Sequence, residues 1–203
     1  MPTTYDFPAS IMQGDVTLTL QGSVSVAESP FSYKRYVQDW GGERWEISID
    51  FISRKIEHVG PLEAFLLKIR HGRNFFRVGD PYKSLPNGTA SGTPVLDGAA
   101  TAGNNTITTR GWSILTVSQL TAGDLIQIED SLYKVLDNVD SDLSGEATIT
   151  VAPRVRKNHA DGTTIKTNNP VGLFATKAEP TITRRSVTSG RATPDSLVGY
   201  EVC

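Results

Sequence analysis

"TAGDLIQIEDSLYKVL", residues 121–136, holds two short runs of alternating apolar and polar residues around the turn Glu129-Asp130-Ser131. Successive side chains of a β-strand point to opposite faces, so this alternation predicts a β-hairpin with one buried face. The residues predicted to point inward are Ile126, Ile128, Tyr133 and Val135. A hairpin of this kind is typical of a small barrel that could bind a sugar, a nucleic acid or another protein, or serve only as a building block.

Further short strands with Gly or Asp turns surround this hairpin, which favours a small closed or half-closed β-barrel. We expect strands near residues 105–109, 115–117, 124–129, 132–137, 146–151 and 171–177. Residues 83–105 are rich in Gly, Ser, Thr, Asn and Pro, which indicates a domain boundary near residues 85–90.

The sequence before this boundary predicts a β-domain with one helix. Trp45, Ile47, Ile49 and Phe51 alternate with polar residues, as expected for an antiparallel strand with a wet face. Residues 61–71 predict a helix, because four apolar side chains recur at helical spacing and Gly72 follows as a stop. These side chains are Leu62, Phe65, Leu66 and Ile69.

The fold class that these patterns predict is mainly β. Residues 1–87 and 178–203 would form a β-sandwich-like domain with the single helix, and residues 88–177 an inserted barrel similar to an OB-fold. In this topology the chain leaves the first domain, builds the barrel and returns to add C-terminal strands to the first sheet.

Composition restricts the class of protein. The 203 residues are 38% hydrophobic and 21% charged with a formal net charge of -2, typical of a globular protein with no electrostatic drive toward nucleic acid. No apolar stretch approaches the roughly 20 residues of a membrane span, and no signal peptide is evident, so we expect synthesis in a cytoplasm. The single cysteine, Cys203, excludes an intrachain disulfide.

The sequence offers no catalytic motif, and we expect no enzyme activity, cofactor or metal. His58, His71 and His159 are far apart and lack the companions of a zinc site. The acidic run at residues 137–146 lacks the spacing of a calcium loop, and we interpret it as a solvated hairpin tip. Nucleophile-elbow, P-loop and dinucleotide motifs are absent from the sequence.

Two groups of aromatic residues are candidates for binding. Trp112, beside a glycine in "TRGWS", is the best candidate for an exposed ligand platform on the barrel, whereas Tyr133 and Phe174 fit a core. Tyr33, Tyr36 and Trp40 lie in an aromatic arm, residues 31–45, where they would either contact a partner or cover the edge of the local core.

The chain resembles the distal tail protein (Dit) family of long-tailed, non-contractile bacteriophages, in its members with an OB-like second domain. The resemblance is carried by "RWEISIDF", "GPLEAFLLKIRHGRNFFRVGDP", "LTAGDLIQIEDSLYKVLDNV", "GEATITVAPRV" and "DGTTIKTNNPVGLFATK", in this order. Together these segments span most of the chain.

The resemblance implies a structural virion protein at the tail tip, in a ring of usually six copies. It also implies neighbours: the tail tube protein, the tape-measure protein, the baseplate hub and tail fibres, with DNA passing through without specific binding and no membrane contact. A ring needs two different patches on each subunit. We expect the aromatic arm and a C-terminal segment with Arg184, Arg185 and Arg191 to contribute to them.

Two other functions remain open from the sequence. The barrel could be a carbohydrate-binding module for attachment to the host surface, which requires an exposed aromatic platform. The chain could also be a stand-alone nucleic-acid binder with an OB-type barrel, which would show salt-sensitive affinity for DNA.

Overall fold

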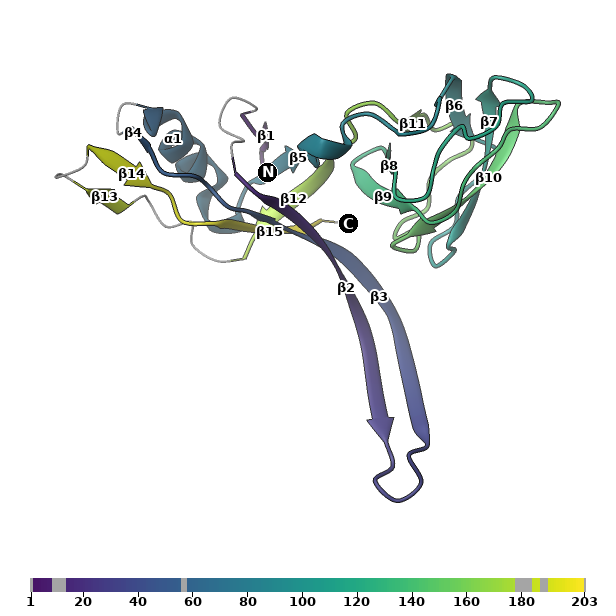
Figure 1. Ribbon diagram of the computed structural model, residues 1–203, viewed down its shortest axis with the longest axis horizontal. Helices are drawn as coiled ribbons and strands as arrows, with labels where there is room; N and C mark the ends of the chain where they lie inside the picture. The colour runs from purple at the N-terminus through teal and green to yellow at the C-terminus, as the bar shows by residue number, and fades with distance from the viewer. Residues whose placement is uncertain (1, 9–13, 56–57, 178–183, 187–189, 203) are drawn as a thin grey trace.

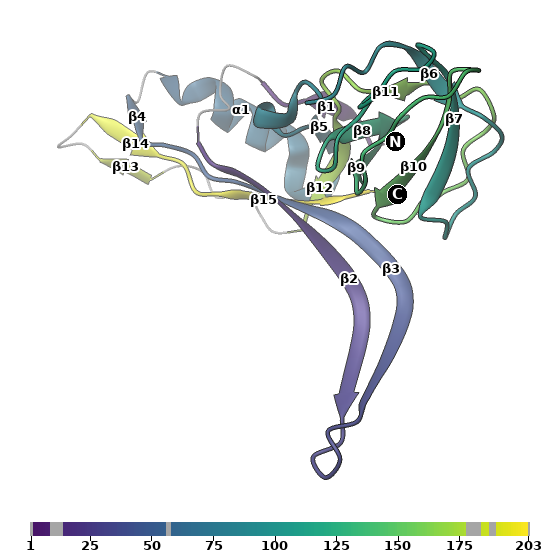
Figure 2. The same ribbon diagram turned by 45° about the vertical axis from the view of Figure 1, so that its right-hand side comes forward.

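The computed structural model describes residues 2–8, 14–55, 58–177, 184–186 and 190–202. It consists of a main sheet covered by one helix, a barrel beside it and a long hairpin arm that extends away from both (Figures 1 and 2). This arrangement confirms the prediction of a mainly β protein with one α-helix. No helix in the described ranges is long and apolar enough to cross a membrane.

The main sheet has six strands, all antiparallel except for the parallel pair β1 and β5. In spatial order they are β1 (Thr4–Asp6), β5 (Phe75–Val78), β12 (Gly172–Thr176), β15 (Leu197–Glu201), β3 (Arg35–Ile49) and β2 (Val16–Glu28). Strand β15 lies between β12 and β3, so the C-terminal part of the chain completes the sheet that the N-terminal part begins.

The helix α1 (Gly60–Ile69) packs on the main sheet through the predicted apolar stripe. Leu62, Phe65, Leu66 and Ile69 are all buried and share a core with Ile47, Ile49 and Phe76 of the sheet. After the helix, Arg70 adopts a left-handed conformation and begins the 3₁₀ turn η3 (Arg70–Gly72). A small sheet of β13 (Arg184–Ser186), β14 (Arg191–Thr193) and β4 (Arg54–Lys55) lies at the helix end of the molecule (Figure 1).

The barrel is a nearly closed sheet of six antiparallel strands. Their order is β11 (Ile165–Lys166), β8 (Leu125–Ile128), β9 (Ser131–Val135), β10 (Glu146–Ala152), β7 (Thr106–Trp112) and β6 (Gly92–Leu96). A bridge between Val95 and Thr164 brings the last strand back to the first. An OB-fold is a five-stranded Greek-key barrel, so the likeness to it extends to size and closure but not to strand number.

Two of the expected barrel strands differ in the structure. Residues 115–117 form an exposed loop, because Leu115 has a left-handed φ of 49° that a strand does not allow. Strand β12 belongs to the main sheet, where it pairs with β5 and β15. Its alternation predicted a strand correctly but carries no information about which sheet the strand joins. The insertion therefore ends before residue 172, and the boundary expected at residue 177 is wrong.

The Gly-rich segment that predicted a domain boundary, residues 83–105, contains strand β6 and follows the turn η4 (Pro81–Lys83). Gly92 has a φ of 106° and lies against the Gly111 carbonyl oxygen, 2.4 Å from where a Cβ would be. The glycine content of this stretch thus serves close strand packing as well as turns.

The hairpin of β8 and β9 forms a wall shared by two cores. Ile126, Ile128, Tyr133 and Val135 are buried inside the barrel, which confirms the predicted inward face. Leu125 and Leu132, on the opposite side of the hairpin, are buried in the core of the main sheet. The barrel is therefore packed directly against the first domain.

Gly72 is a position where the fold should reject a side chain. Its φ is 80°, and a Cβ would lie 2.1 Å from the Thr176 carbonyl oxygen; Gly98 has a nearly equal φ of 82° with open space around it. We expect Gly98→Ala to cost about 1 kcal/mol of unfolding free energy from conformation alone, and Gly72→Ala about 3 kcal/mol or more, because backbone must move. Urea unfolding of both variants measures the difference, and equal costs would contradict the close approach.

Candidate functional site

The outer part of the β2–β3 arm, residues 22–28 and 35–44, is the most exposed regular structure of the chain (Figure 1). Strand β15 pairs with β3 only at residues 46–49, and β2 is the last strand of the main sheet. Among the described strands, none pairs with either edge of the arm. Unpaired strand edges present rows of backbone donors and acceptors that another chain can use.

One face of the arm carries three exposed valines. Val24 pairs with Asp39 and Val26 with Val37, and directly paired residues of antiparallel strands share a face. The side chains of Val24, Val26 and Val37 are 51%, 47% and 58% exposed. On β2 these valines continue the row of Leu18 and Leu20, so the apolar face of the main sheet extends along the arm beyond the body that covers it.

The aromatic residues predicted for the arm are all exposed. Tyr33, Tyr36 and Trp40 are 78%, 59% and 69% exposed, and Phe31 at the tip is 96% exposed. The alternative that these side chains cover the edge of a local core is therefore wrong for this chain. Their role in a subunit interface stays a prediction.

The arm bends where Trp40, Gly41 and Gly42 oppose the single residue Ser23. This register shift is a β-bulge, which bends and twists a hairpin. Gly41 has a φ of 70°, and its N–H donates to Asp39 Oδ1 at 2.8 Å.

The barrel holds this bend through Arg154. The guanidinium of Arg154 pairs with the Asp39 carboxylate, and its backbone N–H donates to Glu43 Oε2 at 2.8 Å. Hydrogen bonds from the Gly41 N–H and from Arg154 lower the pKa of Asp39, so the carboxylate stays ionised. These contacts link the arm to the barrel at the bend.

The barrel and the main sheet meet at a buried polar junction around Leu132. The Leu132 N–H donates to Glu201 Oε1 at 2.8 Å, and the Trp45 indole Nε1 donates to the Leu132 carbonyl at 2.9 Å. Arg156 pairs with the Glu201 carboxylate, whose side chain is 0% exposed. Burial raises the pKa of Glu201, and the Arg156 guanidinium opposes this effect.

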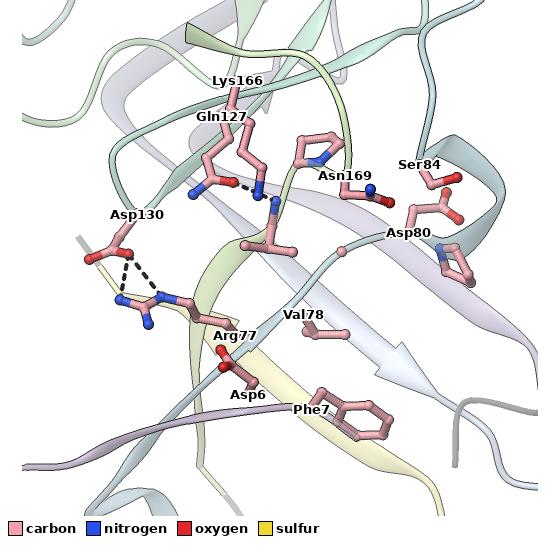
Figure 3. A pocket seen from close by; sticks show the side chains of 14 residues that line it. Asp6, Phe7, Arg77, Val78, Asp80, Ser84, Gln127, Asp130, Lys166 and Asn169 are labelled. Atoms are coloured by element: carbon pink, nitrogen blue, oxygen red, sulfur yellow. Dashed lines mark hydrogen bonds and ion pairs between the residues drawn. The ribbon is translucent and has the colours of Figure 1, made fainter. Parts of the chain in front are cut away.

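A cleft of about 690 Å³ opens where the chain crosses between the main sheet and the barrel (Figure 3). Its polar side chains largely hold the crossing: Arg77 Nε donates to Asp130 Oδ1 at 3.1 Å, and Gln127 Oε1 accepts from Val171 N at 2.9 Å. Asp80 Oδ1 accepts the Tyr82 N–H at 2.9 Å. These groups serve as structural joints between the main sheet and the barrel.

The C-terminal arginines lie far from the arm tip, in the small sheet at the other end of the molecule (Figures 1 and 2). Arg191 is exposed, and its guanidinium donates to the Ser53 carbonyl at 2.6 Å. Arg184 and Arg185 belong to β13, but their side chains lie outside the described residues. The structure thus separates the two predicted interface segments instead of bringing them together.

Trp112 does not form the expected exposed platform. It is 4% exposed and packed in the barrel core, where its indole Nε1 donates to Thr109 Oγ1 at 2.8 Å. Gly111, with a φ of 90°, allows the backbone turn before it. The only other barrel tyrosine or tryptophan, Tyr133, is also buried, so residues 88–170 present no exposed aromatic ring of these types.

The described ranges hold no group of three or more His, Cys, Asp or Glu side chains arranged for a metal ion. His159 is buried in the barrel with its Nε2 3.3 Å from the Tyr133 hydroxyl, and burial lowers its pKa. A buried neutral imidazole beside a buried phenol fits a structural role in the barrel core.

No protein-family model matches the chain, and no curated protein matches it in sequence. Functional inference therefore rests on the arm, the junction and the exposed surfaces described above.

The Arg156–Glu201 pair should be required for docking of the barrel. Arg156→Met leaves a buried carboxylate without its cation, and we expect a loss of about 3–5 kcal/mol of unfolding free energy at neutral pH. The double variant Arg156→Met with Glu201→Leu should recover most of this loss, because no charge then remains buried. Urea unfolding measures both variants, and a double variant as unstable as the single one would contradict the role of the pair.

The single variant should also change the pH dependence of stability. Without Arg156, burial raises the pKa of Glu201 further, so the folded state takes up a proton more readily than the unfolded state. The variant is therefore destabilised when Glu201 is ionised, as pH rises through its raised pKa, and recovers stability as pH falls and Glu201 takes up its proton. We expect the deficit of Arg156→Met to shrink as pH is lowered from about 8 to about 5, a trend that the double variant should lack.

Proposed function

We propose that the chain is a structural virion protein of a bacteriophage tail tip, which assembles into a ring between the tail tube and the baseplate hub and fibres. The observation that carries this proposal is the arm: a long two-stranded hairpin with free edges, exposed valines on one face and exposed aromatic residues. An isolated two-stranded hairpin is marginally stable in water, so an arm of this length is expected to find a partner surface.

A ring is favoured over a two-fold dimer by the separation of the exposed segments. A closed ring needs two different patches on each subunit, one for each neighbour. The arm, with its exposed aromatic side chains, and the small sheet with Arg191 lie far apart on the molecule (Figure 1). The copy number expected from the family resemblance is six.

The proposed partners agree with the charge of the chain. DNA would pass through the proposed ring. Because each chain has a net charge of -2, the ring would not attract the DNA phosphates in general. The tail tube protein, the tape-measure protein, the hub and the fibres would contact the faces of the ring, and the tail tip would be its location in the virion.

The alternative proposal, a carbohydrate-binding barrel, is not favoured by any observation. It depended on Trp112 as an exposed platform, and this side chain is buried. Saccharide sites commonly use an exposed aromatic face, which residues 88–170 do not offer.

The proposal is tested by measuring the mass of the protein in solution by light scattering and by imaging it in negative stain. We expect closed rings with a central hole, increasing in fraction with concentration. A chain that stays monomeric at every concentration, including in the presence of a tail tube protein, would overturn the proposal.

The arm variant Val26→Asp should prevent assembly without unfolding the protein. Val26 is 47% exposed, so a charge there costs little stability in the monomer but would be buried in an interface. Leu85→Asp, at a residue 63% exposed near the domain crossing, is the matched control and should leave rings intact. Light scattering and circular dichroism separate assembly from folding, and rings formed by the arm variant would exclude the arm from the interface.

A further inference from the structure

Two exposed surfaces that lie far apart on the molecule have complementary chemistry. The first is the arm tip, residues 28–37, and the second is a patch on the barrel formed by two neighbouring loops. We call this second surface the aliphatic patch; its residues are Ile114, Leu115, Val117 and Leu143, which are 62%, 64%, 71% and 76% exposed.

The aliphatic patch is held rigidly by hydrogen bonds between its two loops. The Leu115 N–H donates to the Asp142 carbonyl at 3.0 Å, and the Ser141 N–H donates to the Thr116 carbonyl at 3.1 Å. The amide of Gln119, fully buried beneath the loops, donates to the Ser113 carbonyl at 3.0 Å and to Ser141 Oγ at 3.2 Å. The apolar side chains are therefore presented on a fixed framework.

The backbone of this patch is also strained. Leu115 and Ser118 have φ values of 49° and 55°, in the left-handed region that side chains other than Gly, Asn and Asp rarely adopt. Such strain, combined with four exposed aliphatic side chains, is typical of a surface selected for contact and not for monomer stability.

The charges around the two surfaces are opposite. The loops at residues 113–118 and 140–146 contain Asp140, Asp142 and Glu146 and no Lys or Arg. The arm tip carries Lys34 and Arg35 and one acidic residue, Glu28, the cross-strand partner of Arg35, so its net charge is positive. Lys34 Nζ lies 5.5 Å above the Tyr36 ring, so the cations are interleaved with aromatic residues.

The two surfaces of one chain are directed apart. The arm extends away from the barrel in both views, and its tip is at the far end of the molecule (Figures 1 and 2). A contact between them therefore requires two chains.

We propose that the arm tip of one copy docks on the aliphatic patch of a neighbouring copy. Phe31 and Tyr33 would cover the aliphatic side chains, while Lys34 and Arg35 would face Asp140, Asp142 and Glu146. The contact joins different patches of identical chains, so it propagates from copy to copy and can close a ring. The inference rests on the proposed assembly and names the surface that receives the arm.

Disulfide trapping between singly substituted chains tests the contact. One population carries Phe31→Cys and the other Leu143→Cys, both with Cys203→Ser, and the two are mixed and oxidised. The control replaces Leu143→Cys with Leu67→Cys, on the exposed side of α1, where the side chain is 60% exposed. Because docking raises the local concentration of the two thiols, we expect the Phe31–Leu143 heterodimer to form at least about tenfold faster than the control.

The outcomes separate this inference from the proposed function. Rings together with fast Phe31–Leu143 trapping support both. Rings in which this trapping is no faster than the control overturn the docking inference and leave the ring proposal standing. A chain that neither assembles nor traps at this pair overturns both.

A charge-reversal experiment tests the polar part of the contact. Lys34→Glu with Arg35→Glu should lower the trapping rate by about tenfold at low salt, because acidic tips would then meet acidic loops. Glu146→Lys in the partner chain should restore part of the rate, since the exposed Glu146 side chain is not needed for the turn that Asp142 caps. An unchanged rate in the tip variant, or no rescue by the partner variant, would contradict the assigned pairing.

Discussion

The backbone of Leu132 joins the two halves of the molecule. Its N–H is held by Glu201, its carbonyl accepts from Trp45, and its side chain fills the core of the main sheet although the residue belongs to the barrel. Because Glu201 is buried, this joint is stable only with the Arg156 guanidinium beside it. The joint holds the barrel against the main sheet, and Arg154 of the barrel in turn contacts Asp39 and Glu43 of the arm.

Local periodicity predicted the parts of the fold that depend on local sequence. The stripe on α1 and the inward face of the hairpin were predicted correctly, since 3.6-residue and 2-residue periods report directly which side chains share a face. The second buried side of the hairpin was missed. Its only signal was the adjacency of Leu125 with Ile126 and of Leu132 with Tyr133, which breaks strict alternation and marks a strand buried on both faces.

The parts of the structure that depend on distant residues could not be predicted. In "LVGYEVC" the alternation gives no partner for Glu201, which is buried only because Arg156 approaches from the barrel. Trp112 was expected to be exposed because a glycine precedes it, yet the same glycine turns it inward. The aromatic arm of the candidate site could be predicted from the aromatic residues in its sequence. The aliphatic patch could not, because the apolar residues at 115–117 were predicted to form a strand of the barrel.

The place where the barrel enters the chain has a consequence for how such proteins could arise. Val78 and Gly172 are direct partners in the antiparallel pair of β5 and β12, and the Asn169 N–H donates to the Ser84 carbonyl at 2.6 Å. The whole barrel is thus the loop of an ordinary β-hairpin, with its two ends already side by side. An ancestral gene could have acquired, exchanged or enlarged this loop without changing the strand order of the main sheet. The new sequence would only have to supply apolar side chains in place of Leu125 and Leu132, which fill the core of that sheet. The barrel could therefore diversify in sequence faster than the main sheet that carries it.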